Sequence, residues 1–367
     1  MDLFPIRFEN EKVLEDVLRQ MRSIVERGAF ILSDYVNAFE KDFASSINVR
    51  YALGVNSGTD ALMLALKALG VGKGDEVIVP AFTFISTAFA VLYLGARPVF
   101  ADIDPDTFNL MPSEIGRLCN KKTKAVICVH LFGNSCDMAS IMDVSRENNL
   151  YVVEDAAQAH FGRYVSSSGS ERFLGTIGDI GAFSFYPTKN LGAWGDAGMV
   201  VCKSFALYRK MKALRDLGRD KFRYRHDVLG FNTRLDALQA VVLRNKLKFL
   251  ENWTMSRRKT ADFYRCAFTG KLRMQKECAY SVSSYHSFAV LPKSRKKLQC
   301  ALEKSRIPFA IYYPLPLHKQ PVFKKEYGRL SFPNAERISK RIINLPIHPF
   351  LSKSDLNKIV EAVLENA

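Results

Sequence analysis

Residues 51–84, YALGVNSGTDALMLALKALGVGKGDEVIVPAFTF, contain a complete strand–helix–strand unit. Residues 51–58 are expected to be an apolar strand that runs into a turn. Residues 59–70 carry apolar side chains at helical spacing up to Gly70, and residues 76–84 are expected to form a second apolar strand. Strands that are apolar along nearly their whole length and alternate with helices predict a parallel sheet covered on both faces.

The same alternation continues along the chain. A helix is expected over residues 87–95, and further short strands over 97–103, 124–133, 151–157 and 182–188. Two helices, at 10–28 and 36–46, are expected before the first strand. The fold class is therefore predicted to be α/β, with one large and mostly parallel sheet.

The character of the sequence changes near Leu235. A basic helical region at 235–268 leads into segments with short strands, such as 285–291 and 309–314, among lysines and prolines. A chain of 367 residues is also long for a single hydrophobic core. We therefore expect a large α/β domain at 1–240 and a smaller α+β domain at 241–367.

Composition argues for a cytoplasmic protein. Hydrophobic residues make up 48% and charged residues 25%, which are ordinary values for a globular chain. No apolar stretch approaches the ~20 residues needed to span a bilayer, and the N-terminus lacks the pattern of a secretion signal. Seven cysteines without a C-x-x-C pair, and histidines without ligand spacing, predict no bound metal.

The formal net charge of +16 could indicate a nucleic-acid partner. However, the lysines and arginines are spread from Lys12 to Lys358, and they are not interleaved with stacking aromatic residues. We therefore expect no nucleic-acid partner, because an anionic substrate explains the charge at least as well.

Two short motifs follow predicted strands. Residues 56–60, NSGTD, open a helix whose free N–H groups and dipole favour an anion, although Ser57 or Thr59 could simply cap it. Residues 152–158, VVEDAAQ, place Asp155 where open α/β sheets bind ligands, and a carboxylate there could keep a ring nitrogen protonated. Alternatively, Asp155 caps a helix and Glu154 faces solvent.

Two further motifs suggest a nucleophilic amine and a phosphate contact. Residues 184–192, SFYPTKNLG, surround Lys189 with aromatic, proline and glycine residues, and partial burial would lower the pKa of its amine. A surface lysine on a loop is the alternative. Residues 230–239 offer Asn232 and Arg234 at a helix start, where they could bind phosphate or only cap the helix.

From about Phe30 to Pro349, these motifs in this order resemble the DegT/DnrJ/EryC1/StrS family of sugar aminotransferases. The resemblance implies the fold type I, aspartate-aminotransferase-like architecture and a pyridoxal 5′-phosphate cofactor that cycles through its pyridoxamine form. It assigns Lys189 as the Schiff-base lysine and proton shuttle, and Asp155 as the partner of the ring nitrogen. The other cofactor-binding positions that it implies are Gly58, Thr59, Phe84, Gln158, Ser184 and Asn232.

The resemblance also implies that Asn232, with Arg234 nearby, comes from a second subunit. An active homodimer with a shared site is therefore expected. Residues 311–320 and 345–349 resemble family members that aminate C3 of a keto sugar more than members that act at C4. Tyr313 and His318 are candidates for the acceptor site, although His318 could equally be a polar residue in a proline-rich loop.

The resulting hypothesis is transfer of an amino group from L-glutamate to a nucleotide-linked keto sugar, with a preference for the 3-keto position. Such a reaction serves surface-polysaccharide or deoxyaminosugar biosynthesis. A sugar dehydratase or a cyclitol aminotransferase of the same family is an alternative, although dehydratases carry histidine in place of the lysine. A basic nucleic-acid-binding or regulatory protein on the same fold is an alternative of another class.

Overall fold

The computed structural model describes residues 1–219 and 224–366. Its strands are β1 (Tyr51–Val55), β2 (Glu76–Pro80), β3 (Arg97–Ala101), β4 (Thr123–Val129), β5 (Tyr151–Asp155), β6 (Arg163–Val165), β7 (Glu171–Phe173), β8 (Ile180–Ser184), β9 (Gly198–Cys202), β10 (Arg273–Met274), β11 (Ser281–Val282), β12 (Phe288–Leu291) and β13 (Ile343–Leu345).

The helices are α1 (Ile6–Glu11), α2 (Leu14–Arg27), α3 (Asp34–Ser46), α4 (Gly58–Ala68), α5 (Ser86–Leu92), α6 (Pro112–Leu118), α7 (Met138–Glu147), α8 (Phe205–Arg215), α9 (Ala237–Leu247), α10 (Leu250–Phe268), α11 (Arg295–Lys304), α12 (Pro321–Tyr327), α13 (Pro333–Arg341) and α14 (Lys353–Leu364). Two short 3-10 turns cover Leu131–Gly133 and Leu317–Lys319.

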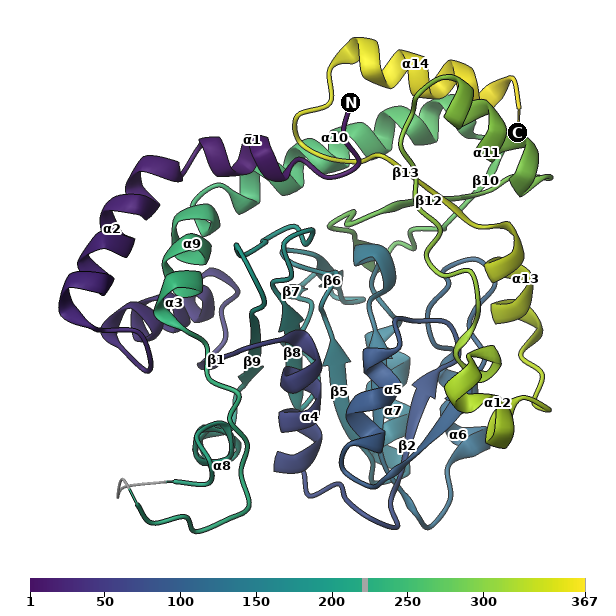
Figure 1. The fold of residues 1–367 in the computed structure, drawn as a ribbon. Helices are drawn as coiled ribbons and strands as arrows, with labels where there is room; N and C mark the ends of the chain where they lie inside the picture. The colour runs from purple at the N-terminus through teal and green to yellow at the C-terminus, as the bar shows by residue number, and fades with distance from the viewer. Residues whose placement is uncertain (220–223, 367) are drawn as a thin grey trace.

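Within the described residues, the large sheet has seven strands in the order β1-β9-β8-β5-β4-β2-β3 (Figure 1). The pairs from β8 through β5, β4 and β2 to β3 are parallel, whereas β9 runs antiparallel to both β1 and β8. The predicted α/β class with a mostly parallel sheet is confirmed.

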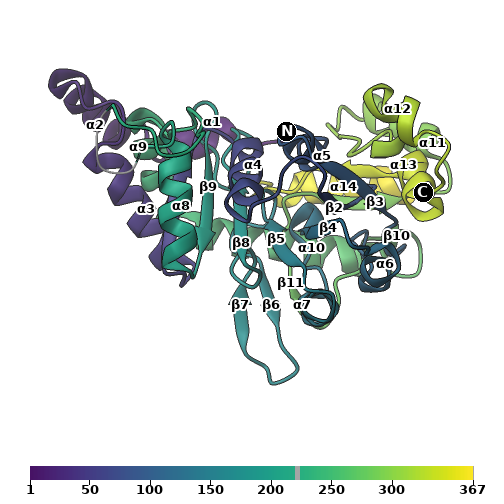
Figure 2. The same cartoon turned by 90° about the horizontal axis from the view of Figure 1, so that it is seen from below.

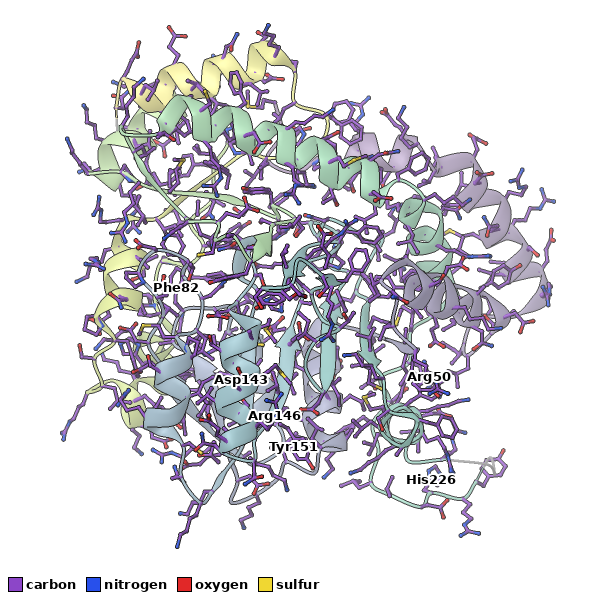
Figure 3. The ribbon with its side chains drawn as sticks, turned by 180° about the vertical axis from the view of Figure 1, so that it is seen from behind. Arg50, Phe82, Asp143, Arg146, Tyr151 and His226 are labelled. Carbon is purple, nitrogen blue, oxygen red and sulfur yellow. The ribbon has the colours of Figure 1, made fainter. Side chains whose placement is uncertain are left out.

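Both faces of this sheet are buried. Successive strand residues point to opposite sides, and each side packs into its own core cluster. In β2, Val77 and Val79 belong to the core cluster that contains helix α4, whereas Ile78 belongs to the cluster on the opposite face. Figure 2 shows helices α4 and α5 on one side of the sheet and α6 and α7 on the other. In Figure 3, the ion pair between Asp143 and Arg146 (3.0 Å) marks the solvent side of α7.

The carboxyl ends of the parallel strands meet at one edge. The register places Val129 beside Asp155, and Asp155 beside Ala182, just before the end of β8 at Ser184. The residues that follow β2, β5 and β8 are therefore brought together from distant parts of the sequence. This edge is where open α/β sheets bind their ligands.

The C-terminal part adds a three-stranded antiparallel sheet, β10-β12-β13, packed with α10, α11 and α14 among the described residues. The helical region expected at 235–268 is divided into α9, which packs on α2 and α3, and α10, which packs on α14. The predicted domain boundary at residue 240 falls inside α9. Helix α1 lies beside α10 in Figure 1. The buried Glu9 of α1 lies 3.6 Å from Lys246 of α9 and 3.9 Å from Arg257 of α10.

No helix among the described residues has the length and apolar character required to cross a membrane.

A buried ion pair fixes β1 to two helices. Arg215 of α8 donates to Glu40 of α3 at 2.6 Å and to the carbonyl oxygen of Gly54 at 2.9 Å. The N–H of Gly54 donates to the same Glu40 oxygen at 2.8 Å. Removing one partner of a buried pair leaves the other charge desolvated without compensation.

We therefore expect Glu40→Ala to lower the free energy of unfolding by about 3–5 kcal/mol, seen as a lower urea midpoint. The control is Glu11→Ala, which removes an exposed pair with Arg7 and should leave the midpoint unchanged. Equal midpoints for the two variants would show that the Glu40 pair does not hold β1 in place.

Candidate active site

A cavity of about 470 Å³ opens at the carboxyl edge of the large sheet. Eight of the ten residues predicted for the site line it: Gly58, Thr59, Phe84, Asp155, Gln158, Ser184, Lys189 and Tyr313. Asn232 and His318 are not among its lining residues. The structure therefore gathers most of the predicted residues around one space.

The start of helix α4 forms a narrow, anion-compatible end of this cavity. Ser57 caps the helix by accepting from the N–H of Asp60 at 3.0 Å, so capping and ligand binding are compatible here. A Cβ atom on Gly58 would lie 2.6 Å from Cβ of Ser184, which explains why a glycine is needed. Thr59 donates its hydroxyl hydrogen to Ser86 at 2.8 Å. The first N–H groups of a helix lack partners within the helix and favour an anion.

Asp155 lies buried at the end of β5. The hydroxyl of Thr87 donates to one carboxylate oxygen at 2.9 Å, and the N–H of Ala157 donates to the other at 3.2 Å. Burial raises the pKa of Asp155, whereas these two hydrogen bonds and the positive charge of Lys189 oppose that rise. A carboxylate held in this way offers a fixed negative charge to a cationic ligand atom.

The alternative in which Asp155 caps a helix and Glu154 faces solvent is wrong. The side chain of Glu154 is fully buried and lies 2.9 Å from Nε2 of His130. It also accepts from the N–H groups of Gly175, Ile177 and Gly178 at 2.6–2.7 Å. Although burial would raise the pKa of Glu154, His130 and the N–H groups of Gly178 and Gly175 lower it. Because strand residues alternate, Glu154 faces away from the cavity and ties β5 to the turn before β8.

Lys189 follows β8 and is partly buried against the cavity. Its N–H donates to the carbonyl of Tyr186 at 2.8 Å, which closes a tight turn. Burial lowers the pKa of the Lys189 amine to about 8, and the Asp155 carboxylate opposes this effect. An amine with this pKa is partly unprotonated near neutral pH, as a nucleophile or base must be.

Gln158 has a fixed orientation. Its Oε1 accepts from the N–H of Phe132 at 2.7 Å, and its Nε2 donates to the hydroxyl oxygen of Tyr313 at 3.0 Å. The Tyr313 hydroxyl hydrogen therefore remains available to a ligand. Phe84 is 55% exposed at the cavity wall, with its ring 6.0 Å from that of Tyr313, so its face is open for stacking.

His318 has a structural environment. Its ring is fully buried, and Nε2 lies 2.9 Å from Oε1 of Glu336. The ring also packs edge-to-face with Phe332, with 4.7 Å between the two ring centroids. Burial lowers the pKa of His318. The expectation that it belongs to the acceptor site is not supported, because its ring packs outside the cavity, in the proline-rich loop.

Asn232 is exposed and pairs with Asp216 as an isolated bridge. Nearby Arg234 is bound to Asp216 at 3.0 Å. Neither residue reaches the cavity of its own chain, so a role for Asn232 in the site of a second subunit stays a prediction.

Several cavity residues were missed from the sequence. Thr83 lies in the turn after β2, and Ser86 and Thr87 begin α5, so hydroxyl groups between a strand and the next helix could have indicated them. Tyr312 and His286 come from the C-terminal part of the chain. Tyr312 is adjacent to the predicted Tyr313 and could have been named with it, whereas the sequence around His286 carries no comparable signal, because only the tertiary structure brings it to this edge.

The model of the DegT/DnrJ/EryC1/StrS aminotransferase family matches residues 12–364. The chain belongs to this family. The resemblance identified from the motifs is thereby confirmed, and with it the assignment of the protein as an aminotransferase.

Two curated relatives illustrate the similarity. A UDP-N-acetyl-3-dehydro-α-D-glucosamine 3-aminotransferase of Acidithiobacillus ferrooxidans is 41% identical over 95% of this chain and 93% of that protein. A protein of Geobacillus stearothermophilus named pleiotropic regulatory protein is 39% identical over 97% of this chain and 95% of its own length.

Solved structures agree in fold. DesV of S. venezuelae superposes with a TM-score of 0.95 at 34% identity, covering 99% of this chain and 97% of its own. NtdA of Bacillus subtilis, solved with bound pyridoxamine phosphate, gives a TM-score of 0.89 at 28% identity over 100% of this chain and 84% of its own. The architecture is that of the pyridoxal-phosphate-dependent aminotransferases.

The opposition between burial and the Asp155 charge makes a testable prediction for Lys189. In cofactor-free protein, the rate at which an acylating reagent modifies Lys189 should rise with pH around a midpoint of about 8. Asp155→Asn removes the charge that favours the ammonium form, so this midpoint should fall. Mass spectrometry of the Lys189 peptide across a pH series measures it.

The matched control is Asp143→Asn, which removes an exposed carboxylate from the outer side of α7 and should leave the midpoint unchanged. A midpoint near the ordinary value of 10.5, or no shift in Asp155→Asn, would contradict the assigned environment of Lys189.

Proposed function

We propose that the cavity binds pyridoxal 5′-phosphate and that the protein transfers an amino group from L-glutamate to a nucleotide-linked 3-keto sugar. The observation that carries the proposal is the meeting of Lys189, Asp155 and the Gly58 turn around one cavity. These features match the three parts of the cofactor, which are an aldehyde, a ring nitrogen and a phosphate.

The residues present fit this cofactor. Only a glycine at position 58 leaves room beside Ser184, and the start of α4 favours an anion, so Gly58, Thr59 and Ser184 would bind the phosphate. Phe84 would stack on the ring, and Gln158 would bind near the ring hydroxyl. Asp155 would face the ring nitrogen, and Lys189 would hold the cofactor covalently.

The bound cofactor would supply an electron sink that stabilises negative charge on the donor's Cα. The protein's own part is proton placement. Asp155 would keep a proton on the ring nitrogen because an ionised carboxylate favours the cationic partner. The amine of Lys189, with a pKa of about 8, would take a proton from the donor's Cα and, in the second half-reaction, would give a proton to the sugar carbon that receives the amino group. Partial burial of this amine supports its action as a base.

The 3-keto acceptor is supported by the relative from A. ferrooxidans, whose name states amination at C3 of a UDP-linked sugar. The net charge of +16 suits an anionic pyrophosphate substrate. Lys189 favours an aminotransferase over a dehydratase of the family, because dehydratases carry histidine at this position. Surface-polysaccharide or deoxyaminosugar biosynthesis would use such a product.

A cytoplasmic homodimer completes the proposal. Asn232 is exposed, and the apolar side chains of Phe30, Ile31 and Leu32 are 38–49% exposed on one segment. Association through this region would bury these side chains and would bring Asn232 to the cofactor phosphate of the partner.

A regulatory function is the second candidate, because the relative from G. stearothermophilus bears the name of a regulatory protein. This alternative predicts a protein that binds its target but forms no amino sugar. The lowered pKa of the Lys189 amine argues against it, because a regulatory protein without catalysis would have no need for such an amine.

The test is incubation of the purified holoenzyme with L-glutamate and a panel of nucleotide-linked 3-keto and 4-keto sugars, with products read by mass spectrometry. We expect 2-oxoglutarate and a 3-amino sugar, and a rate at least about 100-fold lower for Lys189→Ala, since positioned acid–base groups contribute about 10²–10⁴-fold.

Lys203→Ala is a suitable control, because Lys203 follows β9 outside the cavity and its loss should leave the rate unchanged. Absence of product from every sugar would overturn the sugar assignment. A product only from 4-keto sugars would overturn the assignment to C3.

A further inference from the structure

Residues 283–287 connect β11 to β12 and run directly past the active site. The N–H of Ser284 donates to the carbonyl of Gly133 at 3.1 Å, and the N–H of His286 donates to the carbonyl of Phe132 at 2.9 Å. The Ser284 hydroxyl donates to the carbonyl of Gln158 at 3.2 Å. This segment is thus fixed to two loops that shape the cavity, and it places His286 in the cavity wall.

Asn190, the residue after Lys189, fixes the proton on the His286 ring. Its Nδ2 donates to the carbonyl of Ser284 at 2.9 Å, which determines the orientation of the amide. The Asn190 oxygen therefore faces Nδ1 of His286, 3.3 Å away. Since an amide oxygen only accepts, Nδ1 must carry the proton, and the lone pair of the neutral ring lies on Nε2.

The surroundings of His286 keep the ring neutral. Burial lowers the pKa of His286 well below its usual value, and the positive charges of Lys189 and Arg257, together with His160, act in the same direction. Among the hydrogen bonds between described residues, the His286 ring takes part only in the contact of Nδ1 with Asn190, which leaves Nε2 to a ligand. Because His286 lines the cavity, a fixed acceptor on this ring without a protein partner is suited to a ligand group that donates.

We propose that His286 is a substrate-binding residue whose Nε2 accepts a hydrogen bond from a hydroxyl group of the sugar. The inference rests on the proposed function and extends it to the recognition of the acceptor. Both carboxylates of L-glutamate can only accept hydrogen bonds, and its amine is consumed in the reaction. A sugar hydroxyl, in contrast, remains a donor throughout its half-reaction.

Two substitutions separate this role from a purely structural one. His286→Asn can still donate to Asn190 but lacks an acceptor at the position of Nε2. His286→Gln places an amide oxygen near the position of Nε2 but loses the geometry of the contact with Asn190. If His286 binds the sugar, His286→Asn should slow the sugar half-reaction and His286→Gln should largely preserve its rate. If His286 only anchors Asn190, His286→Gln should be the slower of the two variants.

The measurement is single-turnover kinetics of each half-reaction with the holoenzyme, followed through the cofactor absorbance. For His286→Asn, we expect the glutamate half-reaction to stay within about twofold of wild type and kcat/KM for the sugar to fall about tenfold, as for a lost hydrogen bond. His286→Gln should recover most of that loss.

Equal slowing of both half-reactions, an unchanged sugar half-reaction in His286→Asn, or greater damage from Gln than from Asn would each overturn the role of His286. A wild-type enzyme that reacts with glutamate but with no sugar would instead refute the proposed function. The two failures are therefore distinguishable.

Discussion

The site depends on a partly buried lysine amine that lies close to a buried carboxylate. Burial lowers the pKa of Lys189 and raises that of Asp155, so each group loses part of its preference for the charged form. Their mutual attraction opposes both shifts. The balance leaves the lysine amine with a pKa of about 8, which permits it to act as nucleophile and base near neutral pH.

The parallel sheet makes this balance possible. Asp155 ends β5, and Lys189 follows β8, which is its direct neighbour. On the opposite face of β5, Glu154 is held by His130 and by three N–H groups before β8. The two consecutive carboxylates thus have separate tasks, because alternate residues of a strand face opposite sides. Glu154 fixes the strands, and Asp155 serves the cavity.

Much of the fold could be predicted from sequence because its signals are local. The apolar runs of β2, β4 and β5 and the helical spacing of α4 follow from side-chain periodicity. Gly58, Asp155 and Lys189 could be identified because each lies directly after a strand or at a helix start. The environment of Glu154 could not be predicted, because its donors come from residues 130 and 175–178, and the sequence gives no indication of their approach.

Long-range packing explains the remaining differences. His318 lies near Tyr313 in the chain, but its bond to Glu336 holds its ring outside the cavity. His286 reaches the cavity only because the segment after β11 crosses to Phe132 and Gly133. The break between α9 and α10 arises because α9 packs on α2 and α3 whereas α10 packs on α14. Each of these features depends on contacts between residues far apart in sequence.

The most direct test of the central claim is borohydride reduction of the holoenzyme followed by digestion and peptide mapping. Reduction makes the bond between the lysine and the cofactor permanent, so the peptide that contains Lys189 should carry the added phosphopyridoxyl mass. Labelling of another lysine, or of none, would contradict the assignment of Lys189 as the residue that holds the cofactor.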